Sequence, residues 1–106
     1  MKIALCQINP IVGSLNSNTD LIEKNYSNAV NQGADLIIFP EMSIIGYPPQ
    51  DLLNNRSFIR KNDEITADLV SRSGKAYLVF GYVRTNERAL HNSVMISRNG
   101  EANVHL

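Results

Sequence analysis

The stretch Asp35-Leu36-Ile37-Ile38-Phe39-Pro40-Glu41 places a carboxylate directly after a continuous apolar run. Such a run, bounded by polar and turn-forming residues, is typical of a strand that is buried on both faces. In open α/β sheets, ligands gather outside the carboxyl ends of the strands. Glu41 is therefore a candidate site residue, and partial burial would raise the pKa of its carboxyl group toward the range that a general base or proton shuttle needs. On position alone, a structural role is the alternative, either as a cap of the following turn or as the ion-pair partner of an arginine.

The residues before this run predict a strand and a helix. Residues 3–8 have the composition of a strand, and Asn9-Pro10 close it because proline removes a ladder donor. The capping residues Asn16, Ser17 and Asn18 predict the start of a helix that continues to about Asn31. One apolar stripe at the helical period comprises Ile22, Tyr26, Ala29, Val30 and Gly33, and Gly33 suits a left-handed helix end. Strand, helix and strand with short links predict a right-handed unit whose two strands are parallel.

The residues after Glu41 predict an irregular segment, a second helix and three strands. The segment 41–50 is rich in turn formers, and a helix over about 57–73 would place Phe58, Ile65 and Leu69 on one face. The next strand covers residues 76–83. Residues 90–97 and 102–106 are expected to pair antiparallel around Arg98-Asn99-Gly100, since Asn-Gly is the strongest short hairpin signal. The last three residues look like a strand without a cap or polar tail, so we expect the domain to continue beyond them.

Composition excludes several classes of protein. The 106 residues suit one domain, with 43% apolar and 19% charged residues. Lys+Arg and Asp+Glu both number 10, and no basic cluster is present, so nucleic-acid binding is not expected. No apolar stretch is long enough for a bilayer or a signal peptide, and the single Cys6 cannot form an intrachain disulfide. These features predict a soluble, cytoplasmic domain.

An ordered set of motifs carries a family resemblance. Phe39-Pro40-Glu41-Met42 is followed by Gly46-Tyr47-Pro48-Pro49-Gln50-Asp51-Leu52-Leu53, and this pattern resembles the nitrilase, or carbon–nitrogen hydrolase, superfamily. Within it, the pattern is similar to the glutamine-hydrolysing domains of glutamine-dependent NAD synthetases. Further similar stretches are residues 3–10 with Val12-Gly13, residues 33–38, and Leu90-His91-Asn92-Ser93. The resemblance covers essentially the whole chain.

This resemblance implies a fold and a mechanism. The fold would be α/β, the N-terminal part of a four-layer α-β-β-α nitrilase-type sandwich, with an apolar sheet face left for a partner. The family hydrolyses amides with a Glu-Lys-Cys triad of base, oxyanion support and nucleophile. Only the glutamate carries over, as Glu41. The lysine is expected just after a strand equivalent to 102–106 and the cysteine further on, so residues 1–106 would be an incomplete amidase domain, inactive alone.

The resemblance also implies ligands and partners. Glutamine would be the substrate and ammonia the product, which a synthetase would use to amidate deamido-NAD. The amidase part would need no cofactor, whereas ATP and magnesium belong to a separate synthetase domain. We also expect a homo-oligomer, because family members associate through such domains, and neither nucleic acid nor a membrane as a partner.

Tyr47 is the second candidate site residue. Gly46 relaxes the backbone before it and Pro48-Pro49 fix the chain after it, so the ring is expected at a defined angle. The resemblance gives this phenol a place in the substrate pocket. The alternative is an anchoring aromatic side chain tucked under its loop.

The remaining reactive residues favour structural roles. Cys6 is expected in the middle of a strand, where a small thiol packs well and nothing lowers its pKa. Lys75 precedes a strand, at the end opposite to the expected site, and should be solvated. Asn92 either supports the loop of Glu41 or satisfies a strand end. His91 and His105 have no partners at metal-ligand spacing, so no metal site is expected.

The sequence leaves two other functions open. One keeps the superfamily but changes the substrate to another small amide or a nitrile. The other is an α/β interaction module that keeps the scaffold and has no catalysis.

Overall fold

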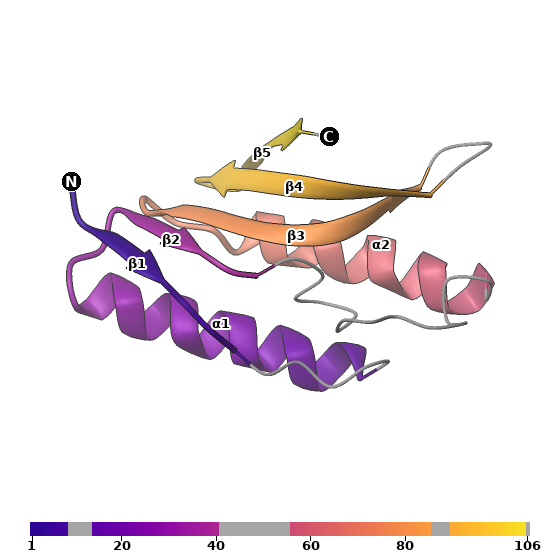
Figure 1. Cartoon of the computed structure of the whole chain (residues 1–106), viewed down its shortest axis with the longest axis horizontal. Coiled ribbons are helices and arrows are strands. Elements are labelled where there is room, and N and C mark those ends of the chain that lie inside the picture. Colours follow the sequence, from indigo (N-terminus) through magenta and orange to yellow (C-terminus); the bar gives the residue numbers. More distant parts are fainter. Residues whose placement is uncertain (9–13, 41–55, 86–89, 106) are drawn as a thin grey trace.

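The computed structural model describes residues 1–8, 14–40, 56–85 and 90–105 (Figure 1). Glu41 and Tyr47 therefore lie outside the described residues. Two helices and five strands follow one another in the order β1 (Ile3–Leu5), α1 (Leu15–Asn31), β2 (Leu36–Ile38), α2 (Arg56–Ser71), β3 (Tyr77–Thr85), β4 (Leu90–Arg98) and β5 (Glu101–His105).

The five strands form one mixed sheet in the order β1-β2-β3-β4-β5. The first three are parallel, with Ala4 opposite Ile37 and Ile37 opposite Leu78. The last two pairings are antiparallel and include Phe80 opposite Met95 and Met95 opposite Val104. The predicted parallel start and antiparallel hairpin are both confirmed.

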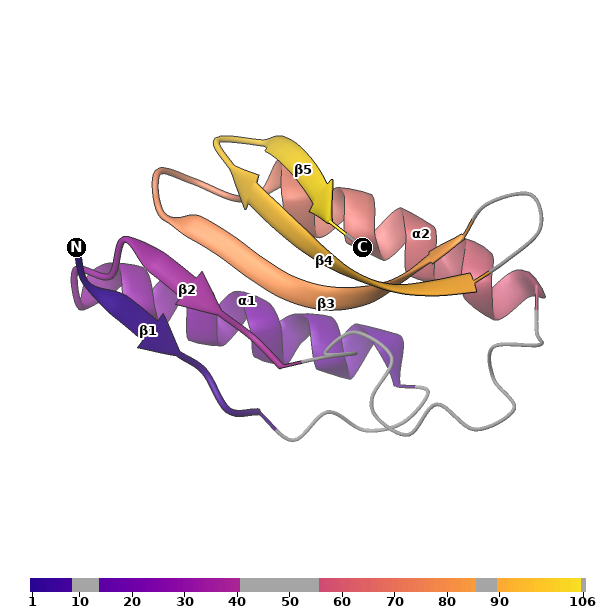
Figure 2. The same ribbon diagram turned by 45° about the horizontal axis from the view of Figure 1, so that its top comes forward.

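Both helices cover the same face of this sheet (Figures 1 and 2). Ile22 of α1, Leu69 of α2 and Leu78 of β3 line one hollow, so the two helices meet over the middle strand. The described residues thus form one helical layer on one sheet. This arrangement matches the expected N-terminal part of an α-β-β-α sandwich, namely two of its four layers.

The two faces of the sheet differ strongly in burial. Ile37 and Phe80 point toward the helices and are 0% exposed, whereas Ile3 and Leu5 on the other face are 54% and 75% exposed. The prediction that residues 35–39 are buried on both faces is wrong for the described residues. Leu36 and Ile38 are only half-buried, because both helices lie on one side.

The first helix ends as Gly33 predicts. Gly33 has φ of 86°, its N–H donates to Val30 O at 2.9 Å, and the Ala34 N–H donates to Ala29 O at 3.0 Å. This pair of bonds is the Schellman motif, in which a left-handed glycine satisfies the last carbonyls of a helix. The chain then enters β2 directly.

The β4–β5 hairpin turns at Asn99 and Gly100, whose φ angles are 53° and 77°. Two consecutive left-handed residues form the type I′ turn that Asn-Gly favours. The turn also contacts the residues that follow α2, since the Asn99 N–H donates to Gly74 O at 2.9 Å and the Gly100 N–H to Ser73 Oγ at 3.2 Å. Turn chemistry and long-range contact therefore agree at this position.

Several predicted boundaries need correction. β1 ends at Leu5, because its pairing with β2 covers three residues only. α1 begins at Leu15, not within Asn16–Asn18, and Ser14 precedes it without a side-chain capping bond. Leu15 is buried and so holds the first turn against the core. Val30, predicted on the buried stripe, is exposed, since the Schellman turn follows it.

Neither helix in the described part of the chain combines the length and the apolar character that a membrane span requires.

Candidate functional site

The carboxyl ends of β1, β2 and β3 form the edge at which a ligand is expected. The ladder continues slightly past the assigned strands, since the Cys6 N–H donates to Ile38 O at 2.9 Å and the Phe39 N–H to Val79 O at 2.8 Å. Phe39 is buried and Pro40 half-buried. The last described residues before Glu41 are therefore held firmly by the middle of the sheet.

The two predicted site residues themselves lie outside this description. Glu41 follows Phe39 by two residues, and Tyr47 belongs to the same stretch, residues 41–55. The structure fixes where this stretch begins, after the Phe39–Val79 bond, and where it ends, at the start of α2. Their assignment as base and pocket residue stays a prediction.

Cys6 lies just past β1, not in the middle of a strand as predicted. Its side chain points to the helical side, where it packs against the core with Ala4 and Ile8. Burial raises the pKa of the Cys6 thiol. A raised pKa lowers the thiolate fraction, and the thiolate is the nucleophilic form. The location was wrong, but the predicted structural role agrees with this environment.

The positions of the other reactive residues do not support a catalytic role. Lys75 is exposed and precedes β3, at the end opposite to Phe39 and Pro40. Asn92 and His91 pair with Val83 and Arg84 in the β3–β4 ladder, and their side chains lie outside the description. Among the described residues, no cluster of three His, Cys, Asp or Glu side chains could hold a metal ion.

A hollow of about 410 Å³ opens on the helix-free face beside the end of β2. Ile38, Val79 and Val94 surround it, and Gly81 leaves its floor without a side chain. Its lining is apolar, which suits packing of another apolar layer better than it suits binding of a polar amide. It adjoins the candidate edge, and Ser93 is the one residue with a polar side chain among those that line it.

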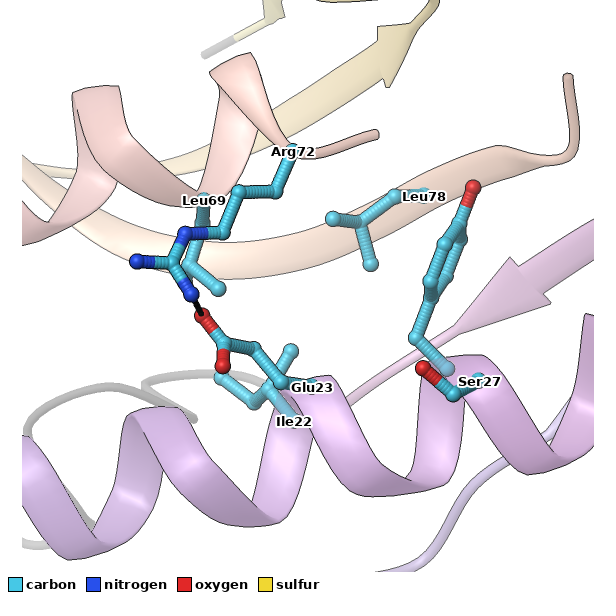
Figure 3. A pocket seen from close by; sticks show the side chains of 7 residues that line it. Ile22, Glu23, Ser27, Leu69, Arg72 and Leu78 are labelled. Atoms are coloured by element: carbon cyan, nitrogen blue, oxygen red, sulfur yellow. Dashed lines mark ion pairs between the residues drawn. The ribbon is translucent and has the colours of Figure 1, made fainter. Parts of the chain in front are cut away.

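A second hollow, of about 230 Å³, lies between the two helices (Figure 3). Ile22, Leu69 and Leu78 form its apolar floor, and the ion pair between Arg72 Nη1 and Glu23 Oε1, at 2.9 Å, crosses its rim. The Arg72 side chain is 59% exposed, so the pair is largely screened by water. Tyr26 and Ser27 also line this hollow, which lies on the helical side of the sheet, away from the predicted site.

Two polar contacts of the core were not predicted from the sequence. Asn62 of α2 is 0% exposed, and its Nδ2 donates to Val83 O at 2.9 Å. The Tyr26 hydroxyl donates to Ala76 O at 2.8 Å and accepts from the Gly74 N–H at 2.9 Å. The helical period places both residues on the inward faces of their helices. A polar Asn or Tyr at such a core position was the feature of the sequence that could have predicted these contacts.

The family model described as carbon–nitrogen hydrolase matches residues 2–105 of this chain. A glutamine-dependent NAD(+) synthetase of Acinetobacter baylyi is 38% identical over 100 residues, which is 93% of this chain and 18% of that protein. The corresponding protein of Thermotoga maritima is 29% identical over 103 residues, again 18% of its length. The chain thus spans less than a fifth of these curated relatives.

Solved structures agree with the sequence relatives. A glutamine-dependent NAD+ synthetase from Acinetobacter baumannii, in complex with ADP, superposes with a TM-score of 0.89 at 35% identity, covering 96% of this chain and 20% of that one. An amidase from Nesterenkonia sp. AN1 superposes with a TM-score of 0.81 at 21% identity, over 97% of this chain and 40% of that one. The second likeness concerns the fold alone.

Proposed function

The chain belongs to the carbon–nitrogen hydrolase family, and from that premise we propose that it is part of the glutamine-hydrolysing domain of a glutamine-dependent NAD synthetase. The observation that carries this proposal is the position of Phe39-Pro40-Glu41 directly after β2, in a chain that matches the family over residues 2–105. The identities of 38% to the NAD synthetase of Acinetobacter baylyi and 35% to that of Acinetobacter baumannii support glutamine as the substrate over other small amides.

In the proposed reaction, Glu41 acts as the general base. It takes the proton from a cysteine thiol, and the resulting thiolate attacks the side-chain amide carbon of glutamine. A lysine and a backbone N–H stabilise the oxyanion of the tetrahedral intermediate. The amide nitrogen leaves as ammonia after it receives the proton, and water then hydrolyses the thioester to glutamate and free thiol.

Of these three groups, only the base is assigned to a residue of this chain. Cys6 is unsuited as the nucleophile, because burial keeps its thiol protonated and its side chain faces the helical side. Lys75 lies at the opposite end of the strands from Pro40. Tyr47 is proposed to line the pocket for the glutamine side chain.

We also propose how the ammonia is used, where the protein is located and that it forms an oligomer. The ammonia would amidate deamido-NAD in a reaction that uses ATP and magnesium elsewhere in the synthetase, and the amidase part itself would need no cofactor. A cytoplasmic location follows from the place of NAD synthesis in this proposal and suits a chain with a single cysteine. A homo-oligomer is part of the proposal too, and the exposed apolar side chains of Ile3, Leu5 and Val94 support association of this sheet face with further protein.

The test is Glu41→Gln in the full-length protein that carries this domain. Glutamine-driven NAD synthesis should fall about 10²- to 10⁴-fold, the usual contribution of a general base. Synthesis driven by added ammonia should persist, because it bypasses the amidase. The matched control is Glu64→Gln, an exposed glutamate on α2, which should leave both rates unchanged. A glutamine-driven rate that survives Glu41→Gln would remove Glu41 from the mechanism.

A further inference from the structure

Asn99-Gly100 is the only Asn-Gly dipeptide among the 106 residues. Asparagine is one of the chemically labile residues of proteins, because its side-chain amide can be lost as ammonia. A following glycine favours this deamidation, since it has no side chain that blocks the approach to its backbone nitrogen. The dipeptide forms the turn between β4 and β5, and both of its residues are exposed (Figure 2). This turn is therefore a candidate site of spontaneous modification.

The reaction at this turn uses groups of the two turn residues and water. The Gly100 backbone nitrogen loses its proton and attacks Cγ of the Asn99 side chain. The new N–Cγ bond closes a succinimide ring, and the side-chain nitrogen takes up a proton and leaves as ammonia. Water then adds to one of the ring carbonyl carbons and breaks its bond to the Gly100 nitrogen. Attack at Cγ leaves aspartate, and attack at the backbone carbonyl carbon leaves isoaspartate, whose main chain runs through Cβ and Cγ.

The fold holds the nitrogen that has to attack. The Gly100 N–H donates to Ser73 Oγ at 3.2 Å, and Ser73 Oγ donates in turn to Val70 O at 2.7 Å. Ser73 is only 6% exposed, so the acceptor of the Gly100 N–H belongs to the core and not to the solvent. Removal of the Gly100 proton by a base in solution therefore requires that this bond opens first.

The other side of the turn is held by the same segment of chain. The Asn99 N–H donates to Gly74 O at 2.9 Å, and Asn99 has a left-handed φ of 53°. Closure of the ring brings Cγ of Asn99 to the Gly100 nitrogen, and the bonds to Ser73 and Gly74 oppose the backbone rotation that this needs. Ser73 and Gly100 are 27 positions apart, so this restraint exists only in the folded chain.

We propose that Asn99 is a deamidation site and that the hydrogen bond between Gly100 and Ser73 suppresses the reaction in the folded protein. Asn99 itself is exposed, so the protection acts on the attacking nitrogen. Arg98 and Glu101, which flank the turn, pair directly with each other. An isoaspartate between them would lengthen the main chain of the turn and disrupt the β4–β5 hairpin. The proposal does not depend on the proposed function.

The first test is Ser73→Ala in the full-length protein, incubated at mildly alkaline pH. Peptide mass spectrometry measures the fraction of aspartate and isoaspartate at position 99 over time. Deamidation should be roughly fivefold faster than in the parent, which is the factor that the loss of one hydrogen bond of average strength implies. The matched control is Ser71→Ala, because Ser71 Oγ bonds to Asp68 O at 2.6 Å within α2, and it should deamidate at the parent rate.

Thr66→Val separates protection of the turn from general stability. Thr66 is buried in the same helix, and its hydroxyl donates to Asn62 O at 2.7 Å, so this variant also loses one buried hydrogen bond. Its thermal unfolding midpoint should fall, as that of Ser73→Ala should. Its deamidation rate should nevertheless equal that of the parent, because the bond between Gly100 and Ser73 is intact.

A second measurement needs no substitution. In guanidinium chloride that unfolds the parent, Asn99 should deamidate faster than in the folded protein, because the bond to Ser73 is absent. Equal rates in the folded and the unfolded parent would overturn the proposal. The same holds if Ser73→Ala deamidates within about twofold of the parent or of Thr66→Val, since the predicted factor for one bond is larger.

If Ser73→Ala does not fold, hydrogen exchange of the Gly100 amide in the folded parent takes its place. Slow exchange, relative to the rate of an unfolded chain, would show that the Gly100 N–H is withheld from base in solution and would support the proposal. Exchange at the rate of an unfolded chain would overturn it.

Discussion

The two ends of the parallel strands are built differently. At the amino end, hydrogen bonds tie the connecting turns to one another. They comprise the Schellman turn at Gly33, the bonds of the Tyr26 hydroxyl with Gly74 and Ala76, and the bond from the β4–β5 turn to Gly74. At the carboxyl end, β3 is held on its β2 side by the Phe39 and Asn62 contacts at Val79 and Val83. Short loops and the long-range bonds of Tyr26 stabilise the amino end, whereas the chain leaves the sheet at the carboxyl end.

From this difference we expect stability to depend mainly on the amino end of the strands and chemistry on the carboxyl end. The loops at the amino end, between α1 and β2 and between α2 and β3, are short, and the Tyr26 hydroxyl joins them through bonds to residues 48 and 50 positions away. The carboxyl end gives rise to residues 41–55, and such loops on a rigid scaffold carry function disproportionately. Substitutions at the amino end should therefore change the free energy of unfolding, and substitutions at the carboxyl end should change turnover.

The largest effect is expected from a substitution in β3, the strand that links the two ends. Phe80 lies in the middle of β3 and is 0% exposed, so Phe80→Ala should lower the free energy of unfolding by about 3–5 kcal/mol, measured by urea denaturation. Leu5→Ala is the control, because Leu5 is 75% exposed and should change stability by less than about 0.5 kcal/mol. Similar losses for both variants would mean that the helix-free face is covered and that the contrast between the faces is wrong.

Tyr26→Phe probes the amino end by itself. It deletes the hydroxyl that joins Gly74 and Ala76 and should destabilise the protein by roughly 1–2 kcal/mol, since each hydrogen bond contributes about 1 kcal/mol. Glutamine-driven turnover in the full-length protein should stay near the parent value. Tyr77→Phe is the matched control, because its hydroxyl accepts an exposed bond from Arg98 and its loss should scarcely register.

Gly33→Ala is a smaller perturbation of the same end. A Cβ at Gly33 meets nothing within 4 Å, so the cost of about 1 kcal/mol comes from the left-handed φ of 86°. Gly74→Ala, whose Cβ would contact the Tyr26 hydroxyl at an ordinary 3.7 Å, should be neutral or slightly stabilising. Equal losses at the two glycines would show that backbone conformation does not set the difference.

The smallest expected effect concerns the chemical reactivity of the Cys6 thiol. Because burial raises the pKa of its thiol, the thiolate fraction at neutral pH lies below that of a free cysteine. Alkylation by iodoacetamide should be slow at neutral pH and should accelerate as pH rises toward the raised pKa. Cys6→Ala should leave glutamine-driven turnover unchanged, whereas a loss of that rate would return Cys6 to the list of nucleophile candidates.

The sequence predicts the amino end better than the carboxyl end, for a physical reason. Gly33 and Asn99-Gly100 select left-handed conformations by themselves, so their turns are predictable from a few residues. The Asn62–Val83 contact joins residues 21 positions apart and depends on where β2 stops pairing, which no local pattern encodes. The one-sided burial of β2 depends likewise on both helices choosing the same face.

The sequence motif around Glu41 predicted the candidate site, whereas the hydrogen bonds and packing contacts near it were not predicted. The run of residues 36–39 correctly placed the end of a strand before Glu41, because apolar runs and Pro40 mark strand ends locally. The mid-strand position predicted for Cys6 was wrong, since the length of β1 is set by its partner β2. The roles of Glu41 and Tyr47 stay predictions.

The central claim is that chemistry belongs to the carboxyl end and stability to the amino end. Its most direct test compares the ratio of glutamine-driven to ammonia-driven NAD synthesis in Glu41→Gln and Tyr26→Phe versions of the full-length protein. The account predicts that this ratio falls about 10²-fold or more for Glu41→Gln and stays at the parent value for Tyr26→Phe. An unchanged ratio for Glu41→Gln, or an equal fall in both variants, would contradict it.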